Sequence, residues 1–352
     1  RSVSRGLGDV YKRQIMEMPY NDIIRKFIDM YAGRLRNQVS FMLSACNFYM
    51  PIFEEALDAY GLPLELRYLP IIESALNPSA VSRAGASGLW QFMIGTGKIY
   101  GLESNSLVDE RRDPIKATWA AARYLKEMYD IYGDWNLVIA AYNCGPGTIN
   151  KAIRRANGET DYWKIYNYLP KETRGYVPAF IAANYVMTYY CDHNICPMET
   201  NIPASTDTVQ VNKNLHFEQI ADLCNVPLDQ IKSLNPQYKK QMIPGDSKPY
   251  TLRLPIDAIS TFIDKQDTIY AHRADELFRN RKTVAVKEIT PSTRKTTTAV
   301  AGKGKLTYYT IKSGDTLSTI AGKYGVSVKD IQRWNGMSNT KIAAGKRLKI
   351  YK

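Results

Sequence analysis

The chain has 352 residues, of which 45% are hydrophobic and 23% are charged, ordinary values for a globular protein. This length allows two or three domains. The formal net charge of +13 indicates an anionic partner. No helix-turn-helix, zinc or aromatic-basic pattern accompanies that charge, so we do not expect nucleic acid. No apolar run reaches the roughly 20 residues of a membrane-spanning helix, which excludes a transmembrane helix in the given sequence.

The first residues differ from the rest of the chain. Residues 1–18 are largely basic and lack periodicity, so we expect a non-native or disordered segment there and leave it out of the fold. Because the sequence opens on Arg1 and not on Met, an export signal or a membrane anchor upstream is compatible with it.

Residues 19–200 carry the apolar periodicity of helices. Ile24, Phe27, Ile28 and Tyr31 recur at helical spacing, and Trp119–Tyr132 repeats the pattern. We therefore predict an all-helical domain over residues 19–200.

Four segments of this domain combine acidic, amide, aromatic and small residues. They are Ile71–Pro78, Ser82–Met93, Ala140–Gly147 and Leu169–Pro178. In the first segment, Glu73 follows the apolar run Leu69–Ile72. A carboxyl group in apolar surroundings loses the solvation of its anion, so its pKa rises and it can donate a proton near neutrality.

The other segments supply groups that suit a sugar. Gln91 and Asn143 can bond acetamido and hydroxyl groups, and Met93 offers an apolar wall. The phenol of Tyr142 can hydrogen-bond the acid or a developing oxocarbenium ion. Taken singly these residues are ordinary, and a glutamate after an apolar run is usually a surface residue of a helix. Their occurrence together and in this order is what indicates a carbohydrate-cleaving site.

The four segments resemble, in order, the Glu-Ser, Gly-Leu-Trp-Gln, Ala-Tyr-Asn-x-Gly and Glu-Thr-Arg-x-Tyr-Val motifs of the family 1 lytic transglycosylases. Their soluble lytic transglycosylase domain is related to goose-type lysozyme. The resemblance covers about residues 19–190 and implies a lysozyme-like helical fold that needs no cofactor and no metal. It implies that Glu73 is the single acid and base and that Tyr142 lies near it. The predicted substrate-binding residues are Ser82, Gln91, Met93, Tyr142, Asn143 and Glu172.

The reaction that this resemblance implies cleaves peptidoglycan without water. Glu73 protonates the bond between N-acetylmuramic acid and N-acetylglucosamine, the substrate's N-acetyl group assists, and the C6 hydroxyl closes a 1,6-anhydro ring. Two alternatives stay open: a lysozyme-like hydrolase that uses water, and a catalytically silent wall-binding scaffold. Product mass distinguishes the hydrolase, and the intact Glu73, Tyr142 and Gln91 argue against the scaffold.

Most glycosidases use two carboxylates, so a second one must be considered. The candidates in the sequence are Asp109, Glu110 and Asp113. Two arginines interleave with them and Pro114 follows, which is typical of an ion-paired helix start. We therefore assign these acids a structural role.

The C-terminal residues 306–352 resemble a LysM module, a β-α-α-β unit that binds N-acetylglucosamine-containing chains. Its predicted carbohydrate-binding residues are Gly314, Asp315 and Thr316, in the turn before the first helix. Residues 274–305 are rich in Thr, Lys and Arg and predict a basic flexible linker.

Residues 205–256 repeat the C-terminal pattern at an offset of 100. Val211 falls on Ile311, Ile220 on Ile320 and Ile231 on Ile331, while Asn214–His216 replaces Gly314–Thr316. The core is retained and the turn is altered. We therefore predict a degenerate LysM-like repeat with weak or absent glycan binding.

Together these patterns predict a mainly α protein: a lysozyme-like all-helical catalytic domain followed by small α+β modules of the LysM type. The expected partners are peptidoglycan glycan strands, the expected state is a monomer, and the expected location is the periplasm or outer membrane of a Gram-negative envelope. Cys191 and Cys196 could form a disulfide or stay as thiols, and the sequence leaves both open.

Overall fold

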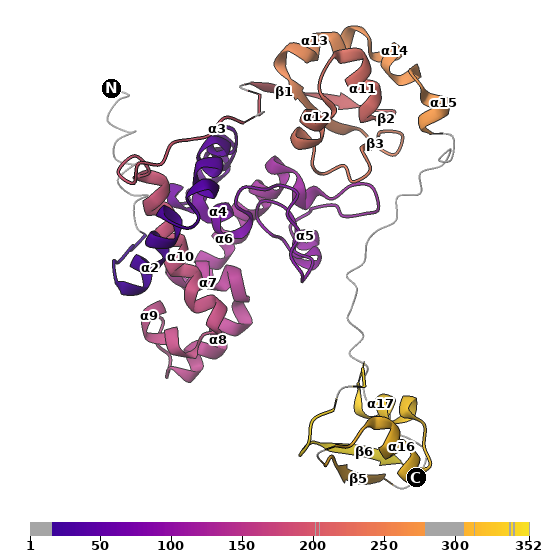
Figure 1. Cartoon of the computed structure of the whole chain (residues 1–352). Helices are drawn as coiled ribbons and strands as arrows, with labels where there is room; N and C mark the ends of the chain where they lie inside the picture. Colours follow the sequence, from indigo (N-terminus) through magenta and orange to yellow (C-terminus); the bar gives the residue numbers. More distant parts are fainter. Residues whose placement is uncertain are drawn as a thin grey trace. The chain divides into compact units, whose positions relative to one another are not determined.

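The computed structural model describes residues 16–200, 202–203, 205–278, 306–312, 314–337, 339–340 and 342–351. The chain divides into two compact units, Arg1–Ile289 and Thr290–Lys352, whose elements Figure 1 labels. Of the predicted N-terminal segment 1–18, residues 1–15 lie outside the described residues. Met16 and Met18 are described and pack against the helical core, so the helical domain includes residues before its predicted start at residue 19.

The first unit opens with an all-helical domain, as the sequence predicts (Figure 1). Its helices are α2 (Asp22–Ala32), α3 (Arg36–Ala59), η1 (Leu64–Tyr68), α4 (Leu69–Ser74), α5 (Ile94–Ile99), η2 (Glu110–Arg112), α6 (Pro114–Tyr132), α7 (Trp135–Cys144), α8 (Pro146–Arg155), α9 (Tyr162–Ile165), η3 (Tyr166–Tyr168) and α10 (Lys171–Thr188).

Local chemistry sets where these helices begin and end. Asn21 and Asp134 accept hydrogen bonds from the first backbone N–H groups of α2 and α7, and Asp113 does so for α6. Pro114 fills the first position of α6, and Gly133 ends that helix in the left-handed conformation.

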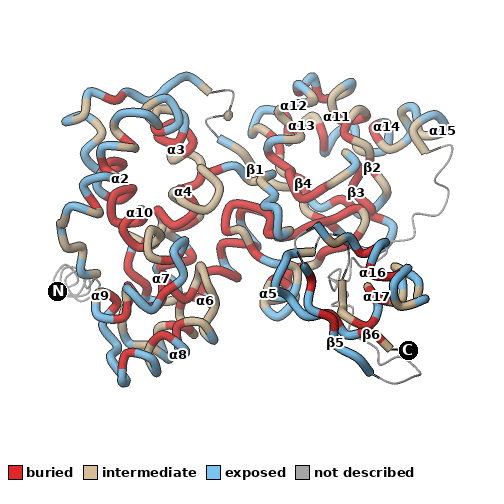
Figure 2. The backbone as a smooth tube through the Cα atoms, turned by 60° about the horizontal axis from the view of Figure 1, so that its bottom comes forward, coloured by how far each residue is buried: buried red, intermediate tan, exposed pale blue. Residues whose placement is uncertain are grey.

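One hydrophobic core unites the helical domain. The long helix α10 packs against α2, α4 and α7, while α3 packs against α6. Phe53, Trp90 and Phe180 are fully buried, and the indole N–H of Trp90 donates to the Thr118 hydroxyl at 2.9 Å. Figure 2 shows the buried inner faces of these helices. This core holds α4 and α10 in place, and both helices carry residues of the candidate active site.

The LysM-like module completes the first unit. It contains β1 (Thr206–Val211), β2 (Asn214–His216), α11 (Phe217–Cys224), α12 (Leu228–Leu234), β3 (Met242–Pro244), β4 (Tyr250–Pro255), α13 (Ile256–Asp264), α14 (Gln266–Ala271) and α15 (Ala274–Leu277). Strands β1 and β4 pair antiparallel around α11 and α12, which confirms the predicted β-α-α-β arrangement.

Two predictions about this module need correction. Its predicted end at residue 256 is too early, because Phe262 and Ile269 of α13 and α14 are buried in its core. The predicted linker start at residue 274 is also too early, because Ala274–Leu277 forms α15 and Phe278 packs against the same core. The remaining linker residues, 279–305, lie outside the described residues.

The structure shows an altered turn before the first helix of the LysM-like module, as the sequence predicts. His216 caps α11 and forms a capping box with Gln219, whereas Thr316 and Thr319 do this for the C-terminal module. In place of a tight turn, β2 pairs with β3.

The second unit is a compact β-α-α-β module, as predicted. Strand β5 (Leu306–Thr310) pairs antiparallel with β6 (Arg347–Tyr351), and α16 (Leu317–Tyr324) and α17 (Val328–Asn335) lie between them in sequence. Ile320, Ile331 and Ile350 are buried in its core.

Two further observations concern the whole described chain. None of the described helices combines the length and the hydropathy needed to cross a bilayer. Cys191 and Cys196 are exposed free thiols and form no disulfide with each other in this structure.

Candidate active site

Glu73 lies at the end of α4, half-buried in a cleft of about 450 Å³. Helices α2 and α3 line one side of the cleft, contributing Tyr31 and Gln38. The segment Ser82–Met93, which we call the 82–93 loop, lines the other side through Ser82 and Gln91. The structure therefore brings the first two sequence motifs together around one carboxyl group.

The backbone around Glu73 is held in an unusual conformation. Ala75 and Leu76, the residues that end α4, both have positive φ (51° and 59°), and Gln91 across the cleft has φ 47°. Side chains other than glycine rarely adopt this conformation, and such strain collects at functional sites. Ser74 stabilises the turn, because its hydroxyl donates to the carbonyl oxygen of Leu89 at 2.9 Å.

The environment of Glu73 suits a proton donor. Burial raises the pKa of Glu73 to about 7, and the negative charge of Glu172 acts in the same direction. The hydroxyl of Tyr176 donates to Oε1 of Glu73 and partly opposes this rise. Near neutrality the carboxyl group therefore populates both of its protonation states, as an acid that later becomes a base requires.

The tyrosine bonded to the acid is Tyr176, which the sequence analysis did not single out. Tyr142 was predicted to offer its phenol to the acid or to a developing oxocarbenium ion; in the structure its hydroxyl donates to the carbonyl oxygen of Trp90 at 2.7 Å. Tyr142 still lies near the acid, because after burial the charge of Glu73 is the largest cause raising the pKa of Tyr142. Tyr176 of α10 takes the predicted role. It lies in the fourth sequence motif, Leu169–Pro178, and this was the signal that could have found it.

The pKa of Tyr176 is also raised well above its ordinary value, first by burial and then by the charge and hydrogen bond of Glu73. Both phenols therefore keep their protons across the physiological range. Each remains a hydrogen-bond donor while Glu73 changes its charge.

Gln91 and Ser82 hold the 82–93 loop as well as facing the cleft. The amide nitrogen of Gln91 donates to the carbonyl oxygens of Gly88 at 2.8 Å and Ala80 at 3.3 Å. The hydroxyl of Ser82 accepts from the backbone N–H of Ala86 at 3.0 Å.

The other predicted binding residues are not among the described residues that line the cleft. Asn143 accepts from the Thr173 hydroxyl at 2.8 Å, so it joins α7 to α10. Met93 is 45% exposed at the start of α5, and Glu172 is exposed in the first turn of α10. Conversely, the sequence did not single out Gln38 and Met42 of α3, which do line the cleft.

The structure confirms the structural role that was predicted for Asp109, Glu110 and Asp113, the candidates for a second catalytic carboxylate. Asp109 forms a bidentate ion pair with Arg111, Glu110 pairs with Lys116, and Asp113 caps α6. The sequence did not indicate that Asp109 and Arg111 of this cluster are buried.

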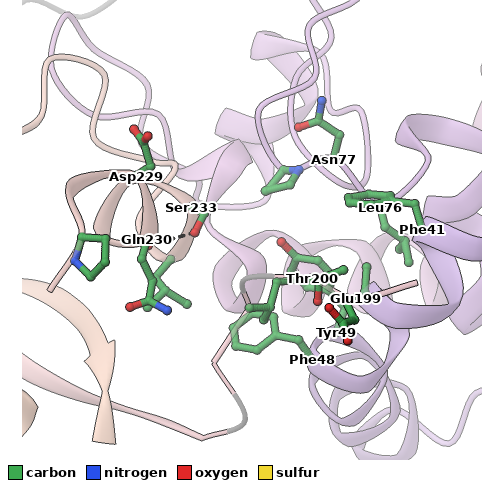
Figure 3. A pocket seen from close by; sticks show the side chains of 15 residues that line it. Phe41, Phe48, Tyr49, Leu76, Asn77, Glu199, Thr200, Asp229, Gln230 and Ser233 are labelled. Carbon is green, nitrogen blue, oxygen red and sulfur yellow. Dashed lines mark hydrogen bonds between the residues drawn. The ribbon is translucent and has the colours of Figure 1, made fainter. Parts of the chain in front are cut away.

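A larger hollow of about 920 Å³ lies between α3 and α12 (Figure 3). Phe41 and Phe48 line it from α3, and Gln230 lines it from α12. Its two carboxylates, Glu199 and Asp229, are exposed. A proton donor needs a desolvated carboxyl group, and of these two hollows the smaller one, around Glu73, provides it.

In the part of the chain that the structure describes, no group of three or more His, Cys, Asp or Glu side chains is placed to hold a metal ion.

The predicted carbohydrate-binding residues of the C-terminal module lie in the turn before α16. Gly314 has φ 89°, and the carboxylate of Asp315 accepts from the Tyr309 hydroxyl and the Lys312 backbone N–H, both at 2.8 Å. Thr316 caps α16. The three predicted carbohydrate-binding positions thus form one ordered turn.

Three family models match the chain. Residues 50–165 match the transglycosylase SLT domain, residues 205–271 match the LysM-like domain of lytic transglycosylase MltD, and residues 309–350 match the LysM domain. These matches confirm the resemblances that the motifs and the repeat indicate.

The chain is also similar to named relatives. It is 32% identical over 350 residues to membrane-bound lytic murein transglycosylase D of Escherichia coli, covering 98% of this chain and 71% of that protein. It is 33% identical over 124 residues to the soluble lytic murein transglycosylase of the same species, covering 34% of this chain and 19% of that one. Among solved structures, the 70 kDa soluble lytic transglycosylase of Escherichia coli matches at a TM-score of 0.36 and 29% identity. That match covers 41% of this chain and 24% of the solved one.

Proposed function

The chain belongs to the family of membrane-bound lytic murein transglycosylase D, and we propose that Glu73 is the acid and base of its reaction. The protein is a peptidoglycan lytic transglycosylase. The observation that carries the assignment of Glu73 is its place as the one carboxylate among the described residues that line the cleft between α3 and the 82–93 loop, where burial raises its pKa.

The first step uses the protonated carboxyl group. Glu73 donates its proton to the oxygen that links N-acetylmuramic acid to N-acetylglucosamine, and the bond from that oxygen to C1 of the muramic acid breaks. The acetamido oxygen of the muramic acid then bonds to C1, which replaces the nucleophilic carboxylate of two-carboxylate enzymes. Among the described residues that line the cleft, Glu73 is the only carboxylate, which favours this assisted route.

The second step uses the ionised carboxylate. Glu73 takes the proton of the C6 hydroxyl while O6 bonds to C1 and the acetamido oxygen leaves. The product is a 1,6-anhydro ring, and the carboxyl group returns to its starting state without water. The Tyr176 hydroxyl, which donates to Oε1, stabilises the ionised carboxylate between the two steps.

The walls of the cleft hold the glycan. We assign Ser82 and Gln91 of the cleft wall to sugar contacts, with the amide oxygen of Gln91 as acceptor because its nitrogen is already bonded to the loop. Met93, exposed at the end of the same loop and outside the cleft lining, offers a further apolar contact. Glu172, exposed at the start of α10, provides a further polar contact. Asn143 acts by holding α7 against α10.

The C-terminal module holds the enzyme on its substrate. Its match to the LysM domain supports binding to N-acetylglucosamine-containing chains through the turn Gly314–Thr316. One relative of this chain is named as membrane-bound and comes from Escherichia coli. This supports the proposal that the enzyme acts in the cell envelope of a Gram-negative bacterium, at the periplasmic face where peptidoglycan lies.

Digestion of purified peptidoglycan sacculi tests this function. Mass spectrometry should show muropeptides that end in 1,6-anhydro-N-acetylmuramic acid, each one water lighter than the lysozyme product. The Glu73→Gln protein serves as the control and should release none. Products that carry only reducing N-acetylmuramic acid would instead establish the hydrolase, and no release by the wild type would contradict the enzyme.

A further inference from the structure

The segment 103–111 connects the LysM-like module to the helical domain. Leu107 and Val108 belong to the buried core of the module although they precede it by about 100 residues in the sequence. The backbone N–H of Asp109 donates to the carbonyl oxygen of Gln237 at 2.9 Å, and that of Lys239 donates to Leu107 at 2.8 Å. The module is therefore paired to the helical domain through backbone as well as side chains.

The same segment carries a buried ion cluster. Nε and Nη2 of Arg111 donate to the two carboxylate oxygens of Asp109, each at 2.8 Å. On the module side, Nζ of Lys239 lies 3.5 Å from Asp109 and donates to the carbonyl oxygen of Asn105 at 2.8 Å. Asp109 thus neutralises one cation from each domain.

The free side of the Arg111 guanidinium reaches the 82–93 loop. Nη1 donates to the carbonyl oxygen of Gly85 at 2.8 Å and to that of Phe92 at 2.9 Å. These two carbonyls bracket the part of the loop that contains Gln91. The planar fork of an arginine can serve a carboxylate and two carbonyls at once, which a lysine cannot.

The loop also lies directly on the backbone of this segment. A Cβ atom on Gly88 would stand 1.8 Å from the carbonyl oxygen of Arg111, so only glycine allows the approach. Nε of Arg112 donates to the Ser87 hydroxyl at 3.1 Å. On its other edge, the loop accepts hydrogen bonds from Ser74, beside the acid, and from Tyr142.

We propose that Arg111 is a positioning residue for the 82–93 loop, and that the LysM-like module supports the active site through Lys239. In this arrangement the module is a part of the catalytic unit, and its loss would disturb glycan binding in a cleft that it does not line. The inference rests on the proposed assignment of the 82–93 loop to the substrate.

Single substitutions in the full chain test this proposal. Arg111→Lys keeps the charge but loses the planar guanidinium fork, and Lys239→Met removes the cation of the module. Lys240→Met, on the exposed neighbouring residue, is the matched control.

The substrate is a soluble tetrasaccharide of two peptidoglycan repeats, which removes any need for the C-terminal module. We expect KM to rise about tenfold in Arg111→Lys and about threefold in Lys239→Met, with kcat within about twofold of the wild type, because misplacing a binding group weakens substrate positioning. Lys240→Met should match the wild type.

The split between KM and kcat separates positioning from stability. A merely structural role would lower the melting temperature and the amount of active enzyme, and therefore kcat, while KM stayed constant. An unchanged KM in Arg111→Lys would overturn the proposal, and equal KM values for Lys239→Met and Lys240→Met would overturn the part that concerns the module. Binding of the same tetrasaccharide to each variant in the Glu73→Gln background, measured by calorimetry, decides the case if a variant folds poorly. A wild type that neither binds nor cleaves the tetrasaccharide would instead contradict the proposed function.

Discussion

Replacing Glu73 by Gln should abolish cleavage and, at the same time, make the protein more stable above neutral pH. The amide has nearly the shape of the acid but carries no catalytic proton, and loss of a general acid or base costs about a hundredfold to ten-thousandfold in rate. The gain in stability has a separate cause. Burial disfavours the carboxylate anion in the folded protein, and the amide never ionises.

The size of the gain comes from the pKa of Glu73. The folded-state pKa of about 7 lies above the ordinary value of 4.5 that the unfolded chain has. A pKa raised by folding stabilises the protein fully below the unfolded value, and that stabilisation is lost as the pH rises to the folded value. At about 1.4 kcal/mol for each pH unit, the wild type should lose about 3 kcal/mol relative to Glu73→Gln between about pH 4.5 and pH 7.

Calorimetric melting of both proteins across this pH range measures the difference. About 3 kcal/mol corresponds to a rise of roughly 6–10 °C in melting temperature for a unit of this size. The control is Glu55→Gln, the same substitution on an exposed residue of α3, which should show no such pH-dependent gain. If Glu73→Gln melted at the wild-type temperature near pH 8, Glu73 would not be desolvated and the argument for its role as the acid would fail.

Three further predictions concern the same site and the C-terminal module. Cleavage of a soluble substrate by the wild type should fall as the pH rises through about 7, and Tyr176→Phe should move this decline upward, because the lost hydroxyl favours the ionised form of Glu73. Glu172→Gln should move the same decline downward, because it removes a negative charge that raises the pKa of Glu73; pH profiles of kcat/KM measure both shifts, and identical profiles would contradict them. Deleting residues 308–352 should weaken binding to insoluble peptidoglycan in a sedimentation assay but spare turnover of soluble fragments, since a tethered module raises the local substrate concentration. Equal losses on both substrates would show that the module belongs to the active site.

The fold was largely predictable because its signals are local or repeated. The apolar spacing of residues such as Ile24 and Ile28 predicts helices that the structure confirms. The offset of 100 that places Val211 on Ile311 predicts a β-α-α-β fold that appears in both modules. Such patterns are visible in sequence because burial dictates the same residue types wherever the same positions recur.

The site was predictable only in part, because hydrogen-bond partners depend on contacts between distant segments. Glu73 could be proposed as the acid from its own motif. The choice between Tyr142 and Tyr176 as its hydrogen-bond partner depends on how α7 and α10 pack beside α4. The cleft wall formed by Gln38 and Met42 carries no motif at all. Similarly, the acids after residue 108 were predicted to be ion-paired, but nothing local shows that Asp109 is buried under another domain.

The two LysM-type modules share their core positions but differ at the turn before their first helix. Both retain the core, and both have an asparagine whose side chain bonds the closing strand: Asn235 donates to Arg253 at 2.7 Å, and Asn335 donates to Lys349 at 2.8 Å. They differ at the turn before the first helix, where the C-terminal module keeps Gly314 and the other forms β2. The module that lost the turn is also the one whose core includes Leu107 and Val108 of the helical domain. This difference fits the proposal that the LysM-like module supports the 82–93 loop, and that the C-terminal module, which keeps the turn, binds the wall. If this reasoning is correct, the segment 205–278, once circular dichroism has shown that it is folded without Leu107 and Val108, should bind chitooligosaccharides far more weakly than the segment 306–352 in a calorimetric titration. Equal affinities would contradict it.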